Sequence, residues 1–305
     1  MKSRKAVRRI AAALVLYVVV SGALAILIAE ATLHPARRVL SDDDIARGRD
    51  LARRTQAALS DPMIIVADGT NLHGWLLRPE LPNGDAVILL HGLSDNRLGM
   101  IGYAELLITH GYTVLMPDAR AHGESDGSVA TYGLFEKTDV HSWYEWLHQN
   151  ADTRCIFGFG ESMGAAQLLQ AVQSEPNFCS IAVESPFSNF REIGYDRVGQ
   201  FFRTGPWLGR TIFRPVIDFA LLYVRWRYKL DMESVSPENA VAKTITPIFL
   251  IHGSEDRNIP FRHSQRIIAR NQHIVLWEVP GTDHCGAIST HPDEFAARLL
   301  AWFRK

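Results

Sequence analysis

A sharp turn between a buried strand and a helix limits the folds that this chain can adopt. The apolar run CIFGF (155–159) predicts a strand covered on both faces, and the run AAQLLQAV that begins at Ala165 predicts a helix. Between them stands G-E-S-M-G (160–164), with small residues where strand and helix approach each other. In such a turn the hydroxyl of Ser162 projects at the helix N-terminus, where backbone N–H groups favour developing negative charge. The turn therefore indicates a nucleophilic serine.

Apolar runs and helical patterns alternate through most of the remaining chain. Runs typical of strands buried on both faces lie at 86–90, 113–116, 181–184, 248–252 and 273–279. Helical patterns lie at 103–110, 134–150, 165–174 and 292–304. Two further apolar runs flank Asp68-Gly69, a pair that favours a hairpin. The alternation predicts the α/β class, with a mostly parallel twisted sheet and helices on both of its faces.

Two later strands end close to residues that can assist a serine. The strand IFLIHG (248–253) leads into Asp256, and the strand IVLWEVPG (274–281) leads into His284. A serine hydroxyl is a poor nucleophile until a base removes its proton, and an acid in turn orients the base. We predict that Ser162, Asp256 and His284 meet at the carboxyl edge of the sheet as nucleophile, acid and base, in the chain order that such sites use.

Other acidic residues compete with Asp256 for the role of the acid. Glu255 stands beside it and Glu184 follows the preceding strand, while Asp256 itself has the alternative role of a loop or helix-capping acid. Asp283 is a weaker competitor, because its adjacency to His284 in the chain makes the required hydrogen bond hard to form.

The oxyanion of a tetrahedral intermediate needs two preorganised N–H donors. The backbone N–H of Met163, directly after the serine, is the first candidate, and that of Leu93, in the loop after the strand at 86–90, is the second. His91 and Gly92 are expected to shape this loop rather than to react. We expect no metal and no cofactor, since no CxxC or HExxH spacing occurs in the sequence.

Several segments of the chain resemble the α/β-hydrolase superfamily. They are HGLSDN (91–96), PDARAHGESDG (117–127), GFGESMG (158–164), HGSEDRNIP (252–260) and GTDHCG (281–286). The chain from Met63 onward looks most like serine-aminopeptidase-like and prolyl-oligopeptidase-like members and membrane-anchored relatives of the Bem46 type. The resemblance implies the α/β-hydrolase fold, the serine triad and the oxyanion loop. Ala121 stands where the family often has glycine, a departure in loop packing, and Asp118, Arg120 and His122 are expected to be structural.

The N-terminus has the pattern of a membrane anchor. Residues 1–9 hold five basic residues and no acid, and residues 10–29 form a run of twenty residues without a charge. Twenty helical residues span the hydrocarbon core of a bilayer, which is about 30 Å thick. A cleaved signal peptide is the alternative, with weak cleavage sites at 23–25 and 29–31, but its apolar centre is usually shorter. A buried helix of a soluble protein fits the basic flank less well.

The distribution of arginine and lysine predicts the orientation of this anchor. The basic flank favours a cytoplasmic N-terminus by a small margin, since four arginines also follow the run. We expect a single-pass protein of the inner (cytoplasmic) membrane with its catalytic domain outside the cytoplasm. Residues 30–60 are predicted to form a connector, with a helix over 41–59 capped at Ser41, and residues 61–305 the hydrolase domain.

An insertion of distinct composition interrupts the alternation at about 186–235. It has no clear strand pattern, and it holds eleven aromatic residues between 187 and 228, with eight basic and three acidic residues between 191 and 229. Such an insertion is a candidate helical cap over an active site, or a set of helices packed at the sheet edge. Its composition suggests an amphiphilic or acyl substrate near a lipid surface, unless the arginines are solvated and the aromatic residues form core.

Charge and cysteine content exclude other classes of protein. The formal net charge of −1 leaves no overall basic field for a nucleic-acid backbone. Three cysteines are too few for a disulfide scaffold. A bond between Cys155 and Cys179 is conceivable outside the cytoplasm, but adjacent parallel strands rarely give the required geometry. Cys285 is expected to be a small packing residue or a thiol at a pocket wall.

The sequence leaves two classes of function open. The first is a serine hydrolase that cleaves an ester, thioester or amide through an acyl-enzyme on Ser162, with His284 as general base and acid and Asp256 orienting its ring. Small-molecule or lipid-like esters are favoured over the peptides of an aminopeptidase, because amide hydrolysis also demands protonation of the leaving group. The second class is a non-catalytic binding protein that retained the fold.

Overall fold

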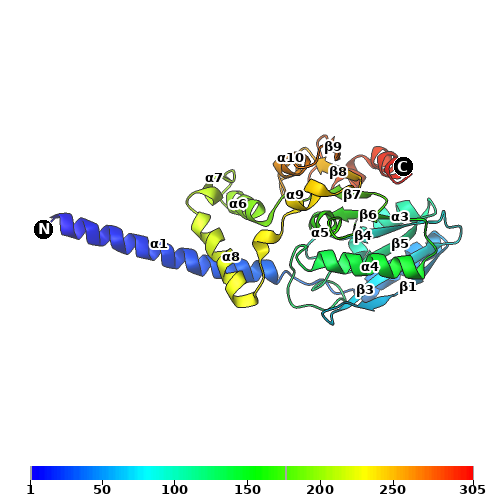
Figure 1. Ribbon diagram of the computed structural model, residues 1–305, viewed down its shortest axis with the longest axis horizontal. Coiled ribbons are helices and arrows are strands. Elements are labelled where there is room, and N and C mark those ends of the chain that lie inside the picture. The colour runs from blue at the N-terminus through cyan, green and yellow to red at the C-terminus, as the bar shows by residue number, and fades with distance from the viewer. Residues whose placement is uncertain (1, 176, 305) are drawn as a thin grey trace. The chain divides into compact units, whose positions relative to one another are not determined.

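The apolar runs of the sequence form one sheet in the part of the chain that the structure describes. This computed structural model describes residues 2–175 and 177–304. Its strands are β1 (Ala57–Ser60), β2 (Met63–Ile65), β3 (Asn71–Pro79), β4 (Asp85–Leu90), β5 (Thr113–Pro117), β6 (Cys155–Glu161), β7 (Ile181–Glu184), β8 (Ile248–Gly253) and β9 (Val275–Val279). They lie in the order β1-β3-β5-β4-β6-β7-β8-β9, and β2 pairs with β3 (Figure 1).

The strand directions confirm the predicted mostly parallel sheet. β4 runs parallel to β5 and to β6, and the pairs β6–β7, β7–β8 and β8–β9 are parallel as well. The antiparallel pairs all involve β3, and β2 and β3 form the hairpin expected around Asp68-Gly69. Since parallel strands end at the same edge, the loops after β4, β6, β8 and β9 emerge together at the carboxyl edge.

Helices account for most of the remaining described residues. They are α1 (Lys2–Leu33), α2 (Asp42–Arg54), α3 (Ile101–Ile108), α4 (Glu136–Asn150), α5 (Met163–Ala171), α6 (Phe190–Phe201), α7 (Trp207–Arg210), α8 (Arg214–Tyr228), α9 (Pro237–Ala240), α10 (Arg262–Ile268), α11 (Ala287–Thr290) and α12 (Pro292–Trp302). Short 3₁₀ turns are η1 (Arg97–Met100), η2 (Met232–Ser234) and η3 (Val241–Lys243).

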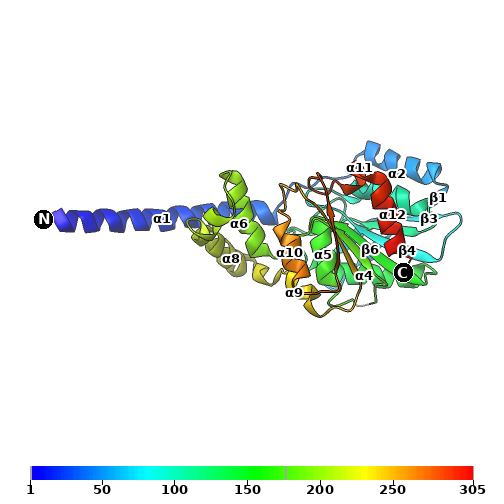
Figure 2. The same ribbon diagram turned by 90° about the horizontal axis from the view of Figure 1, so that it is seen from above.

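Helices cover both faces of the sheet, as predicted (Figure 2). Residues of α2, α3 and α12 form one apolar core, and residues of α4, α5 and α10 form the other. Along β4, Val87 and Leu89 enter the first core while Ile88 and Leu90 enter the second, because side chains alternate along a strand. This double coverage explains why the strand has a continuous apolar sequence rather than an alternating one.

The predicted connector differs in part from the observed structure. α2 begins after Ser41, whose hydroxyl accepts from the backbone N–H of Asp44 while the Asp44 carboxylate accepts from the Ser41 N–H. The predicted helix over 41–59 is wrong at its C-terminal end, because α2 ends at Arg54 and β1 follows, paired with β3. Leu51 is fully buried in the core beneath the sheet, so α2 belongs to the body of the protein rather than to a polar linker.

A disulfide joins Cys155 and Cys179, whose Cα atoms lie 5.7 Å apart. The expectation that parallel neighbours rarely allow this bond failed because Cys179 lies outside the strand. It stands in the loop before β7, where its N–H donates to the carbonyl oxygen of Ile156. The loop therefore approaches Cys155 at an angle that a regular parallel ladder does not provide.

The chain forms two compact units. The larger unit extends from Pro35 to Asn189 and from Val235 onward and holds the sheet. The smaller unit comprises the chain up to His34 together with residues 190–234. Among its described residues it is helical, in agreement with the missing strand pattern of the predicted insertion.

α1 is the long helix of the smaller unit. By length and composition its segment Arg4–Leu33 is able to cross a membrane, a test that a signal sequence or a buried core helix also passes. α8 packs beside the C-terminal half of α1 (Figures 1 and 2). The buried side chains of α1 are Ser21, Ala25, Ala29 and Leu33, one residue per helical turn.

Candidate active site

Ser162 occupies a strained position between β6 and α5. Its φ of 51° and ψ of −110° lie outside the regions that ordinary residues favour. A Cβ on Gly164 would lie 2.3 Å from the carbonyl oxygen of Leu90, and a Cβ on Gly160 would lie 2.6 Å from the carbonyl carbon of Gly164. The two glycines are therefore what lets the turn close against the end of β4.

The structure brings Ser162, His284 and Asp256 into direct contact. His284 Nδ1 lies 2.8 Å from Asp256 Oδ2, and His284 Nε2 lies 2.9 Å from Ser162 Oγ. With the Nδ1–H donating to the carboxylate, Nε2 is left to accept from the serine hydroxyl. The imidazole side chain is 19% exposed while the carboxylate is fully buried. The ring thus joins the hydroxyl to a carboxylate that water does not reach.

Asp256 is held as a carboxylate by several donors. Its Oδ1 accepts the backbone N–H groups of Asn258 at 2.9 Å and Ile259 at 2.8 Å. Burial alone would raise the pKa of Asp256, but its contact with His284, the Ile259 N–H and the hydroxyl of Ser185 outweigh burial and lower the pKa. An ionised Asp256 is the state that orients the ring and stabilises its protonated form.

The competing acids do not meet the ring of His284. Glu184 is fully buried and accepts the backbone N–H of Ala287 at 2.9 Å. Asp283 accepts the backbone N–H of His284 at 2.9 Å, so it contacts the main chain of the histidine and not its imidazole. Glu255 is exposed beside the turn. Of the four acids weighed from the sequence, Asp256 has the required contact.

The candidate oxyanion donors lie on the two segments that flank the serine. Met163 is the first residue of α5, so its N–H has no acceptor within the helix. Leu93 belongs to the loop after β4, and a Cβ on Gly92 in this loop would lie 3.7 Å from the Cβ of Ser162. The loop therefore lies directly against the serine.

His91 fixes the conformation of this loop. Its ring is almost fully buried, and its Nε2 accepts the backbone N–H of Ala119 at 3.0 Å. Its Nδ1–H donates to the carbonyl oxygen of Gly92 at 2.7 Å. Burial lowers the pKa of His91 and favours this neutral tautomer. The residue thus has a shaping role, as expected from the sequence, and joins the loops after β4 and β5.

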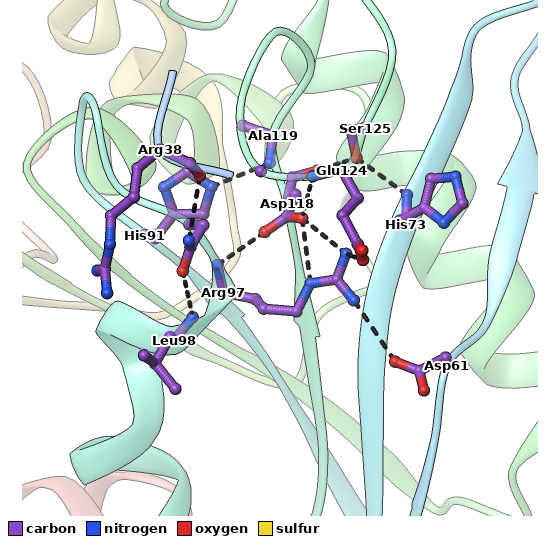
Figure 3. Close-up of polar contacts among 12 residues, drawn as sticks. Arg38, Asp61, His73, His91, Arg97, Leu98, Asp118, Ala119, Glu124 and Ser125 are labelled. Carbon is purple, nitrogen blue, oxygen red and sulfur yellow. Dashed lines mark hydrogen bonds and ion pairs between the residues drawn. The ribbon is translucent and has the colours of Figure 1, made fainter. Parts of the chain in front are cut away.

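A buried ion pair reinforces the same two loops (Figure 3). One carboxylate oxygen of Asp118 accepts the backbone N–H of Arg97 at 2.7 Å. The other accepts from the guanidinium at 2.7 and 3.1 Å and from the N–H of Glu124 at 2.8 Å. Arg120 likewise makes a two-pronged contact with Asp139, at 2.6 and 2.7 Å. The first ion pair therefore joins the loops after β4 and β5 to each other, and the second joins the loop after β5 to α4.

One buried and one half-buried carboxyl group near Ser162, His284 and Asp256 were not anticipated from the sequence. The hydroxyl of Tyr103 lies 3.2 Å from a carboxyl oxygen of Glu161 and 3.4 Å from one of Glu184. Burial raises the pKa of Glu161 to about 7 and that of Glu184 to about 8. One phenol proton cannot serve both groups, so a proton shared among them relieves their repulsion. Glu161 and Glu184 meet because the ends of β6 and β7 lie side by side.

One group in the described chain has the composition of a metal site. His141, Glu145 and Glu175 each place a potential ligand atom within 4.8 Å of the others. His141 Nδ1 already forms a 2.7 Å hydrogen bond with Glu175. The cluster shares no residue with Ser162, His284 and Asp256.

Comparison with known proteins identifies the family. The model of the alpha/beta hydrolase family matches residues 87–298, and the chain belongs to this family. Uncharacterized protein YqkD of Bacillus subtilis (strain 168) is 28% identical over 210 residues, which cover 68% of this chain and 66% of that protein, slightly under two thirds of its length.

Solved structures give the same fold. Pyrococcus furiosus esterase Pf2001 superposes with a TM-score of 0.69 at 25% identity, covering 88% of this chain and 96% of that one. Pyrococcus horikoshii acylaminoacyl peptidase gives a TM-score of 0.61 at 16% identity, covering 82% of this chain and 42% of that one. Together with the family match, these similarities support a hydrolase.

Proposed function

We propose that the protein is a serine hydrolase that cleaves carboxylic esters through an acyl-enzyme on Ser162. The observation that carries the proposal is the imidazole of His284, which bridges the serine hydroxyl and the buried carboxylate of Asp256. The strained turn at Ser162 and the donors at Leu93 and Met163 supply the other parts that acyl transfer needs.

The proposed reaction has two halves. Ser162 Oγ attacks the carbonyl carbon while its proton passes to His284 Nε2, and the N–H groups of Leu93 and Met163 stabilise the oxyanion. The intermediate collapses, the alcohol leaves with the proton from His284, and the acyl group stays on the serine. Water then attacks the acyl-enzyme with His284 as base, which releases the acid and restores the hydroxyl. Asp256 stabilises the imidazolium in both halves.

Esters are the preferred substrate class, with thioesters and amides as alternatives. The alkoxide of an ester leaves with little assistance, whereas an amine must be protonated as it leaves. The named esterase at 25% identity supports the same choice, while the peptidase at 16% identity speaks only for the fold. An aminopeptidase-type activity is the second candidate, and a small or lipid-like ester is the first.

A panel of p-nitrophenyl esters of increasing chain length beside aminoacyl anilides tests this proposal. The wild type and Ser142→Ala, a control on α4 whose hydroxyl bonds only the Thr138 carbonyl, are expected to hydrolyse esters faster than anilides. Ser162→Ala should lose at least roughly a thousandfold in rate. Equal rates for Ser162→Ala and the wild type overturn the proposal, faster anilide cleavage favours a peptidase, and a folded but inactive wild type favours a binding protein.

We also propose that α1 is a retained anchor, as in membrane-anchored relatives of the Bem46 type. Cleavage at 23–25 would remove two of the four side chains that α1 buries, and cleavage at 29–31 would remove three of them together with Glu30, which accepts from the hydroxyls of Tyr223 and Tyr228. A helix with such partners is part of the folded protein rather than a leader. The Cys155–Cys179 disulfide supports an extracytoplasmic body, because disulfides persist in oxidising compartments.

The proposed domain organisation follows from this anchor. Residues 1–9 form the cytoplasmic flank and residues 10–29 enter the inner membrane, which makes the protein single-pass. Residues 61–305 carry the hydrolase, with the helical insertion at 186–235 as its cap. The basic and aromatic composition of the insertion is the feature that supports a lipid-like substrate.

A further inference from the structure

The smaller unit covers one side of the C-terminal part of α1. From Arg4 to Val20 every residue of α1 is exposed, and burial begins at Ser21. The hydroxyl of Tyr17 already donates to the backbone carbonyl of Ile212, at the turn that precedes α8. Ile10–Val20 is therefore the apolar part that is uncovered on all sides, whereas beyond it one side of the helix is buried and Leu24, Leu27 and Ile28 stay exposed.

The length of this uncovered part is too short for a bilayer. Eleven helical residues from Ile10 to Val20 extend about 16 Å, while the hydrocarbon core is about 30 Å thick. The basic side chains before Ile10 gain some length by reaching toward the cytoplasmic headgroups. A bilayer that holds Ile10–Val20 therefore also reaches the part of the smaller unit that lies beside Tyr17.

The part beside Tyr17 has the composition of a membrane interface. Residues 201–214, which we call the interfacial tip, contain three arginines and no acidic residue. The exposed apolar side chains of the tip are Phe201, Phe202, Trp207 and Ile212. Phe202 stacks on Phe213 and contacts Phe201, so the end of α6 and the start of α8 share one aromatic cluster.

We propose that the interfacial tip inserts into the outer phospholipid leaflet, at the boundary between headgroups and acyl chains. Helical elements of this composition bury their apolar side chains about 5–10 Å into that boundary. Because the tip lies beside Tyr17, the outer boundary then lies about 5–10 Å beyond that residue, near Val20 to Leu24. Arg203, Arg210 and Arg214 then lie at the level of the phosphates, where anionic lipid attracts them.

The proposal moves the outer membrane boundary from Ala29 to the region of Val20 to Leu24. α8 runs in the same direction as α1, since Ile212 lies beside Tyr17 while Tyr223 and Tyr228 bond Glu30. At 1.5 Å per residue, Trp226 lies about 20 Å farther from the membrane than Ile212. The proposal thus assigns Ile212 to lipid and Trp226 to water, although both side chains are exposed and belong to the same unit.

The inference rests on the proposed membrane insertion of α1. Fluorescence quenching by brominated phospholipids tests the insertion of α1 and the insertion of the interfacial tip separately. Cys285→Ala leaves no free thiol besides the introduced one, because Cys155 and Cys179 are bonded. In this background, single cysteines replace Val15, Ile212 or Trp226 in the full chain. Each carries a bimane probe in vesicles of phosphatidylcholine and phosphatidylglycerol. Leu81→Cys, at an exposed apolar position of the larger unit, is the matched control.

We expect brominated lipid to quench the probe at 212 as strongly as that at 15, and the probes at 226 and 81 not at all. Quenching at 15 without quenching at 212 overturns the interfacial tip and leaves the anchor intact. Absence of quenching at 15 rejects the anchor itself. A probe at 212 that is shielded from aqueous iodide but not quenched by brominated lipid assigns the tip to a contact between protein copies and also overturns the proposal.

Discussion

Replacing Glu184 with glutamine should remove part of the pH dependence of the free energy of unfolding. Glu184 is fully buried, and burial raises its pKa from 4.5 to about 8 against the opposing N–H of Ala287. The neighbouring charges of Glu161 and Asp256 act in the same direction as burial. The folded protein therefore keeps a proton on Glu184 at pH values where the unfolded chain has lost it.

The sign and the size of the effect follow from this difference. Between the unfolded pKa of 4.5 and the folded pKa of about 8, the folded state binds more protons, so the free energy of unfolding falls as pH rises. At pH 8 the accumulated loss from Glu184 is roughly 4 kcal/mol. For a protein of this size, that loss corresponds to roughly 10 °C in melting temperature.

Thermal unfolding from pH 5 to pH 8 measures the effect. Glu184→Gln, which resembles the protonated acid, should melt close to the wild type at pH 5 and roughly 10 °C above it at pH 8. A residual slope should remain, because the pKa of Glu161 is also raised, to about 7. Glu278→Gln, on the exposed face of β9, is the control and should follow the wild type. Parallel profiles for Glu184→Gln and the wild type would refute the reasoning.

Two variants and the reduction of a disulfide provide further tests. Asp256→Asn should lower kcat for ester hydrolysis by roughly three to four orders of magnitude with an unchanged melting temperature, because its amide holds His284 in the wrong tautomer, and a loss below tenfold contradicts this role. Gly164→Ala should abolish labelling of Ser162 by a fluorophosphonate, since its Cβ would lie 2.3 Å from the Leu90 carbonyl oxygen; retained labelling means that the turn yields. Reduction of the Cys155–Cys179 disulfide should lower the free energy of unfolding by about 2–4 kcal/mol, and quantitative thiol labelling of the unreduced, unfolded protein should find only Cys285. Three labelled thiols would contradict the bond.

The order of buried strands was predictable because each lies between two helical layers. β4 and β7 have continuous apolar sequences, and only strands covered on both faces need them. β1 was missed for the opposite reason. Its residues Ala57–Ser60 have little strand preference and follow a well-capped helix, so the strand exists through its pairing with β3.

The nucleophile, acid and base of the candidate site were predictable from their order along the chain. Ser162, Asp256 and His284 each follow a strand that ends at one edge, so topology alone brings them near each other. The contact between Glu161 and Glu184 was not predictable. This contact depends on the parallel register of β6 and β7, in which these two residues are direct neighbours.

The disulfide shows the same dependence on position. The sequence predicted a strand at 181–184, where β7 lies, but not the path of the loop that places Cys179 beside Cys155. Because β7 begins at Ile181, Cys179 lies in the preceding loop and is not held in the geometry of paired parallel strands. The path of that loop, which apolar patterns do not indicate, decided the outcome.

Locating a fluorophosphonate adduct by peptide mass spectrometry tests the central claim most directly. The reagent phosphonylates a serine only where a base activates the hydroxyl and donors stabilise the oxyanion. We predict one adduct per chain, on the peptide that contains Ser162, and little or none in His284→Ala. An adduct on another serine, or undiminished labelling without the imidazole, would contradict the account.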